Sequence, residues 1–186
     1  MAVLVGAVGQ LYQGDLDFGR VVVDGIEPGA LGPGVAVAHL DYGAVAVAQD
    51  LEELRPDALI LVGAAQRGRA PGTLERRPVA SQRLDPADAG RAIAEAVTGY
   101  VTLDLVLEVG SALGVLPPHT VTIELEPVRI GPSDELSPAA AAALGRARRL
   151  ITMELRALRR RRGQPGRPAE PPRVEHPASR RQGHRP

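Results

Sequence analysis

The first 19 residues constrain the fold of this chain more than any other segment. An apolar run at residues 2–5 leads into glycines at positions 6 and 9, and then into Gly14-Asp15-Leu16-Asp17-Phe18-Gly19. This order predicts a buried strand, a tight glycine loop and a helix whose first turn carries two carboxylates. In an α/β fold such a junction lies at the carboxyl end of a strand, where ligands usually bind. We therefore expect the functional site here first.

The rest of the chain alternates strand and helix patterns. The run at 59–62 is wholly apolar, as in strands that are buried on both faces of a parallel sheet. Strands alternating with helices imply a mostly parallel sheet covered on both faces. The expected fold class is α/β, a three-layer α/β/α sandwich with a mostly parallel five-stranded sheet. Further strands are predicted at 35–40, 73–77 and 119–125, and helices at 44–54, 86–97, 103–113 and from Pro138 towards Arg160.

The zero net charge conceals an asymmetry along the chain. All 22 basic residues are Arg, and ten of them lie from residue 156 onward against two Glu. The other twelve Arg face twenty acids, so residues 1–155 carry a net charge of −8. From residue 163 the chain is rich in Pro, Gly and Arg, with too little apolar surface to offset the entropy of ordering. We expect one domain at 1–162 and a disordered Arg/Pro-rich tail at 163–186.

Composition excludes several kinds of chemistry. The chain has no Cys, which excludes disulfides, thiolate metal sites and a cysteine nucleophile. Without Lys it cannot form a phosphate-binding loop that ends in Gly-Lys-Ser/Thr. No signal peptide and no stretch of about 18 apolar residues occurs, so a cytoplasmic protein that does not contact membranes is expected. The basic tail lacks interleaved aromatic residues, which predicts no specific nucleic-acid binding.

Five short motifs occur in a characteristic order. The first joins Gly9-Gln10 to Gly14-Asp15 and Phe18-Gly19 after the first strand. The other four are Asp41-Tyr42-Gly43-Ala44-Val45-Ala46, Ala70-Pro71-Gly72-Thr73, Glu126-Pro127 and Leu136-Ser137-Pro138. Together they resemble the nickel–iron hydrogenase maturation endopeptidases (hydrogenase maturation proteases), a family of peptidases, over about residues 1–157. The resemblance implies a hydrogenase maturation protease-like α/β domain that acts on a hydrogenase large subunit, whose carboxyl-terminal extension the family removes.

The resemblance also implies a metal site, and its three ligand positions are substituted. In the family, an acid in the first helix turn, an Asp ending the third strand and a His further on recognise nickel held by the large subunit. Alignment places Leu16, Gly63 and Gly99 at these positions, and no His lies between His39 and His119. Neither Leu nor Gly supplies a lone pair about 2 Å from an ion. We therefore expect no bound metal and no cofactor.

Asp15, Asp17 and Asp41 are the remaining candidate catalytic residues. Asp15 and Asp17 flank Leu16 but are expected to point elsewhere, because neighbours on a helix are rotated by about 100°. In the plainer interpretation, Asp15 is an N-cap or first-turn acid and Asp41 caps the helix that follows it. His39 is expected to be a lone polar group near the edge of the core.

Two functions of different classes stay open. The chain could be a divergent endopeptidase that still trims a large subunit, with the metal in the substrate and Asp15, Asp17 or Asp41 assisting. Alternatively, it is a catalytically silent relative, a pseudoenzyme that binds a large subunit or accessory maturation proteins as an assembly factor. Family resemblance favours the first function, and loss of the ligands favours the second. The sequence leaves enzymatic activity undecided.

Overall fold

A five-stranded open sheet forms the centre of the computed structural model, which describes residues 1–80, 84–96 and 101–163. The strand order is β2-β1-β3-β5-β4, and β4 alone runs antiparallel to its neighbour. The α/β class and the mostly parallel sheet are confirmed. The strands are β1 (Val3–Ala7), β2 (Val35–His39), β3 (Ala58–Ala64), β4 (Leu74–Val79) and β5 (His119–Leu125).

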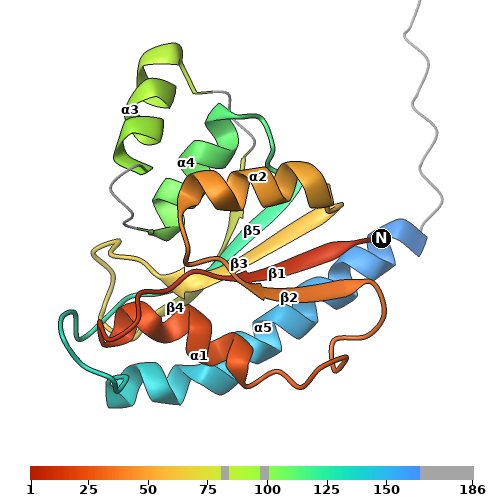
Figure 1. Cartoon of the computed structure of the whole chain (residues 1–186). Coiled ribbons are helices and arrows are strands. Elements are labelled where there is room, and N and C mark those ends of the chain that lie inside the picture. The colour runs from red at the N-terminus through yellow and green to blue at the C-terminus, as the bar shows by residue number, and fades with distance from the viewer. Residues whose placement is uncertain (81–83, 97–100, 164–186) are drawn as a thin grey trace, which may run out of the picture.

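Helices cover both faces of this sheet, as Figure 1 shows. On one face lie the short 3₁₀ helix η1 (Asp15–Asp17), α1 (Phe18–Asp24) and α5 (Pro138–Gly163). On the other lie α2 (Ala44–Leu54), α3 (Pro86–Ala96) and α4 (Leu103–Ala112). The central strand β3 is apolar throughout because both of its faces are buried. Leu59 and Leu61 enter the core beneath α2 and α4, whereas Ile60 and Val62 enter the core beneath α1 and α5. The three layers are therefore held by two separate cores.

Local signals fix where the helices begin and end. The Ser137 hydroxyl accepts a hydrogen bond from the backbone N–H of Ala140 at 3.2 Å, so Ser137 caps α5 and Pro138 takes its first position. The Thr102 hydroxyl caps α4 in the same way. At the end of α2, Arg55 adopts a left-handed conformation just before Pro56.

The differences from the sequence prediction are local. The first turn after the glycine loop is a 3₁₀ helix, and α1 begins only at Phe18. The predicted tail lies outside the described residues apart from Gly163, the last residue of α5, and so does Gly99. Within the described part of the chain, no helix is both long enough and apolar enough to cross a membrane.

Candidate functional site

The candidate site lies where β1 and β3 end, beside the loop at residues 8–14 and the start of α4. The backbone N–H of Val8 donates to the carbonyl of Val62 at 2.8 Å, which ties the two strand ends together. Gly19 of α1 packs directly against them, because a Cβ at this position would lie 2.2 Å from the Val62 carbonyl oxygen. The side-chain amide of Gln10 donates to the Val101 carbonyl at 3.1 Å and joins the loop to α4. The sequence located this junction correctly.

Asp15 is a buried acceptor that holds two loops together. Its Oδ2 accepts hydrogen bonds from the N–H groups of Val128 and Arg129 at 2.8 and 3.0 Å and from the Ser137 hydroxyl at 2.8 Å. Its Oδ1 accepts the N–H of Ser137 at 2.7 Å. Burial alone raises the pKa of Asp15, but these hydrogen bonds outweigh burial and lower it. Of the two expected roles, the N-cap was wrong, since Asp15 caps neither η1 nor α1 with its side chain, but Asp15 does lie in the first turn of η1 as an acid.

Asp17 begins a chain of charged groups that reaches His39, the last residue of β2. Arg20 donates from Nε to Asp17 Oδ1 at 2.8 Å and from Nη1 to Asp24 Oδ2 at 2.9 Å. Asp24 also pairs with His39, whose Nε2 lies 2.9 Å from Oδ1, so the prediction of a lone His39 was wrong. Asp41 does not cap α2 with its side chain, and its charge acts on Arg20. Asp17 and Asp41 therefore both act on Arg20, whereas Asp15 binds the loop at residues 128–137.

The positions aligned with metal ligands do not fit a metal ion. Leu16 is half-buried, and Gly63 lies at the end of β3 where a Cβ would be 2.7 Å from the Val8 carbonyl oxygen. The side chain of Leu103 fills the remaining space, 3.1 Å from that same Cβ position. Among residues 1–80, 84–96 and 101–163, no group of three or more His, Asp and Glu side chains is placed to hold a metal ion. Gly99 lies outside the described residues, so its position stays a prediction.

A buried carboxylate with three arginines lies at the neighbouring strand end, and sequence reasoning missed it. Glu124 is fully buried and receives hydrogen bonds from Arg67 at 2.9 Å, Arg77 at 2.9 Å and Arg69 at 3.2 Å. The Thr122 hydroxyl donates to the same carboxylate at 2.8 Å. Burial raises the pKa of Glu124, but these donors overcome burial and lower it to about 2. No motif signals this cluster, because its members come from β4, β5 and the loop after β3.

No protein-family model and no curated protein matches the chain. The hydrogenase 2 maturation peptidase from Thaumarchaeota archaeon SCGC_AB-539-E09 shares 28% identity, with a TM-score of 0.59 over 83% of this chain and 98% of the other. The chain is therefore similar in fold, and at 28% identity in sequence, to a hydrogenase maturation peptidase.

Two further solved structures have the same fold at lower identity. The hydrogenase maturating endopeptidase HybD from E. coli matches 85% of this chain and 94% of its own, at 18% identity and a TM-score of 0.61. The maturation protease HycI from Thermococcus kodakarensis KOD1 matches 83% and 92%, at 18% identity and a TM-score of 0.58. The family fold therefore spans almost the whole length of these relatives.

The family-like motifs contact one another in pairs. The N–H of Gly72 donates to the Glu126 carbonyl, and the N–H of Glu126 donates to the Thr73 carbonyl, both at 2.8 Å. In the same way, the Gly14-Asp15 motif meets the Leu136-Ser137-Pro138 motif through the Asp15–Ser137 hydrogen bonds. These motifs therefore hold the loops at the carboxyl edge of the sheet. In this chain they build the scaffold around the site without supplying a metal ligand set.

Proposed function

We propose that this chain acts in nickel–iron hydrogenase maturation as a non-cleaving factor that binds the precursor of a hydrogenase large subunit. The family fold supports the maturation role. The observation that carries the non-cleaving half is the filled space at Gly63, where the Val8 carbonyl and the Leu103 side chain leave no room for an aspartate. Asp15 already accepts four hydrogen bonds, and Asp17 is paired with Arg20. The nearby acids thus have structural partners.

An exposed apolar surface beside the site supports a binding role. We call it the loop patch, and it consists of Leu11, Tyr12, Val128 and Ile130, which are each between 46% and 69% exposed. The two loops are adjacent because Gly14 bridges to Ile130 and the N–H of Ser133 donates to the Tyr12 carbonyl at 3.0 Å. Large apolar side chains that are held in the open beside a site are typical of protein-binding surfaces.

The test uses the full chain and a nickel-loaded precursor large subunit from the same genome, with the nickel-free precursor in parallel. Size-exclusion chromatography should show a complex, and mass spectrometry should show that the carboxyl-terminal extension stays intact. The variant Leu11→Ser/Val128→Ser/Ile130→Ser should weaken the complex by about tenfold or more. Met153→Ser is the matched control, because Met153 is equally exposed but lies on α5.

Each outcome bears on one half of the proposal. Loss of the extension within a few turnovers, abolished by Asp17→Asn, would overturn the non-cleaving half and favour a divergent endopeptidase. Failure to bind the precursor in either nickel state would overturn the role on the large subunit. Equal weakening by the loop-patch variant and by Met153→Ser would remove the loop patch from the contact surface.

A further inference from the structure

The two edges of the sheet are built differently. The edge strand β4 carries Glu75, Arg76, Arg77 and Pro78, and charged residues and proline protect an edge from pairing with another chain. The opposite edge strand, β2, reads Val-Ala-Val-Ala-His and contains neither proline nor an acid, Lys or Arg. Within the described part of the chain, β1 is the strand that pairs with β2. Among the described residues, this edge of the sheet is therefore open to a further strand.

The backbone groups that face outward on β2 can be identified. The Gly34 carbonyl accepts from β1 and the N–H of Leu40 donates to β1, at the two ends of the strand. Because the groups of a parallel ladder alternate, the even-numbered residues of β2 bond to β1. The N–H and C=O groups of Val35, Val37 and His39 consequently point towards the open edge. An added strand would find three residues ready to pair.

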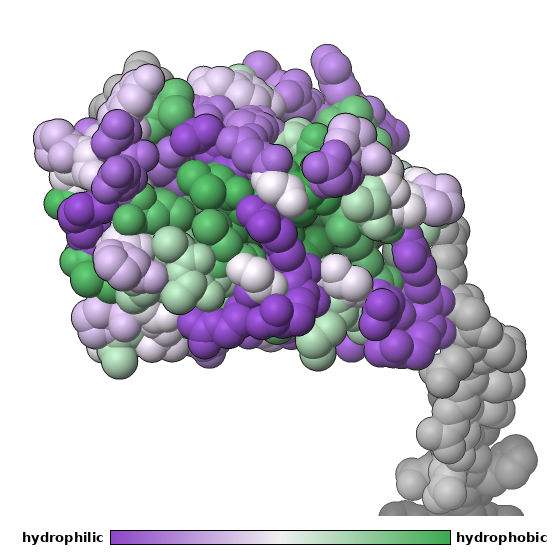
Figure 2. Space-filling view, turned by 90° about the horizontal axis from the view of Figure 1, so that it is seen from below, coloured by the Kyte–Doolittle hydropathy of each residue, from purple (hydrophilic) through white to green (hydrophobic). Residues whose placement is uncertain are grey.

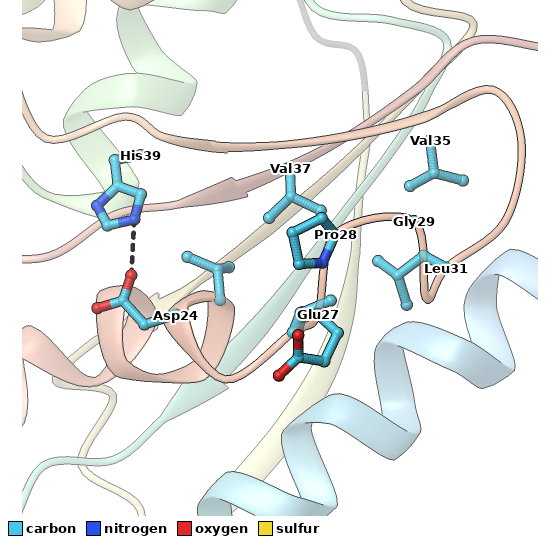
Figure 3. A pocket seen from close by; sticks show the side chains of 10 residues that line it. Asp24, Glu27, Pro28, Gly29, Leu31, Val35, Val37 and His39 are labelled. Carbon is cyan, nitrogen blue, oxygen red and sulfur yellow. Dashed lines mark ion pairs between the residues drawn. The ribbon is translucent and has the colours of Figure 1, made fainter.

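An apolar hollow lies on each side of this edge. On the α1 side, a cavity of about 430 Å³ is lined by Val23, Ile26, Leu31, Val35 and Val37, among others (Figure 3). Its outer wall is held in place, because Arg159 donates to the Leu31 carbonyl at 2.8 Å. Seen from the side of α1 and α5, apolar side chains reach the surface between charged ones (Figure 2).

The second hollow lies on the α2 side of β2. It measures about 280 Å³, and Ala36, Leu54 and Pro56 are among the residues that line it. Side chains of a strand alternate between the two faces of its sheet. Successive residues of an added strand would therefore enter the two hollows in turn.

Charge indicates the kind of partner. Asp24 and Glu27 line the α1-side hollow and are exposed, but Asp24 is already paired with Arg20 and with His39, so Glu27 is the acid that a basic residue of a partner would face (Figure 3). A second copy of this chain would bring another Glu27 and another body with a net charge of −8 at residues 1–155 to the same place. A segment with basic residues flanking an apolar stretch is complementary instead.

We propose that β2 binds an extended segment of another polypeptide as a sixth strand. The apolar side chains of this segment alternate between the two hollows, and a basic residue faces Glu27. The backbone hydrogen bonds supply the affinity and the hollows supply the side-chain preference. This surface does not depend on the proposed maturation role, since it requires neither the loop patch nor the site at the strand ends.

The probe is the capped peptide Arg-Val-Leu-Val-Leu-Val-Arg, added to the ¹⁵N-labelled full chain. Amide hydrogen exchange followed by NMR should slow about tenfold or more at Val35, Val37 and His39, the three outward N–H groups. Ala36 and Ala38, already bonded to β1, should change little. No protection at the outward amides with millimolar peptide would overturn the proposal. So would protection that rises with the concentration of the chain without peptide, because the occupant would then be a second copy.

Variants at Val37 distinguish the contribution of backbone pairing at the edge from that of the side chain. Val37→Pro removes an outward N–H without removing a bond to β1, and it should weaken binding of the fluorescein-labelled peptide by about tenfold. Val37→Thr keeps the N–H and the branched shape and is the matched control, with an expected change below about threefold. Val37→Lys is a second variant that should block pairing of an added strand. It should disturb the backbone less than proline does, since the Val37 side chain is 41% exposed. Equal binding by the Pro, Lys and Thr variants would refute pairing at this edge.

Discussion

Replacing Asp15 by Ala removes a fully buried acceptor and leaves four donors of two loops without it. A hydrogen bond to a charged group contributes about 1.5–3 kcal/mol, and a buried donor left unpaired costs about 1–3 kcal/mol. The donors at Val128 and Arg129 are only partly buried, so water can replace part of their loss. The N–H and hydroxyl of Ser137 are buried and cannot be rescued in that way. We expect the free energy of unfolding to fall by about 4 kcal/mol.

Urea unfolding followed by circular dichroism at pH 7 measures this loss. With a slope of about 2 kcal/mol per molar urea, the midpoint should fall by about 2 M. The melting temperature should fall by about 8–16 °C. Asp15→Asn keeps one acceptor oxygen and should lose about half as much. Asp134→Ala, an exposed acid on the same loop, should change stability by less than about 0.5 kcal/mol.

A free energy of unfolding of the Asp15→Ala variant within about 1 kcal/mol of that of the unmodified chain would contradict this prediction. Asp15 would then not be the group that holds the two loops. A stability loss of the expected size, with the same loss in the presence and absence of the precursor large subunit, would place Asp15 in the scaffold and outside the chemistry.

Four further predictions follow from the same contacts. Because the pKa of Glu124 is lowered to about 2 from 4.5, its contribution to the free energy of unfolding is complete above pH 4.5 and is lost as the pH falls towards 2. Urea midpoints measured across this range should reveal a loss of about 3 kcal/mol, and the Glu124→Gln variant should lack this pH dependence. Gly63→Asp forces a Cβ to within 2.7 Å of a carbonyl oxygen and should cost about 2–4 kcal/mol of stability without creating a metal site, whereas an unchanged melting temperature would show that the backbone yields easily. Calorimetric titration of the chain truncated after Arg162 with Ni²⁺, Zn²⁺ or Cd²⁺ should give dissociation constants no tighter than about millimolar, and stoichiometric micromolar binding would contradict this. The same truncation should shift the melting temperature by no more than about 2 °C, since exposed ion pairs return less than the entropy of ordering such a segment; a fall of several degrees would make the tail part of the fold.

The fold could be predicted because the backbone pattern is local. The apolar run at 59–62 and the alternating segment at 119–125 both became strands within a few residues of the expected bounds. Ser137-Pro138 placed the start of α5, since capping depends on neighbours in the chain. The order of the short motifs indicated a resemblance to hydrogenase maturation endopeptidases, and the similar solved structures have the same fold.

The roles of the acids could not be predicted in this way. A carboxylate just before a helix suggests a cap, yet Asp15 bonds to residues more than 110 positions away. His39 looked isolated in the sequence, and the fold placed Asp24 opposite it. The partners of a charged side chain depend on which loops the sheet brings together, and no local pattern records that.

By itself, the sequence determined the three-layer α/β architecture, the resemblance to hydrogenase maturation endopeptidases, and the absence of donor side chains at Leu16 and Gly63. Only the tertiary structure decided that Leu103 and the Val8 carbonyl fill the space beside Gly63. It also decided that Glu124 is surrounded by arginines and that one edge of the sheet is open between two hollows. The physical reason is that backbone conformation follows from short-range propensities and apolar periodicity. Packing, burial and the pairing of charges depend on contacts between segments that are far apart in the chain.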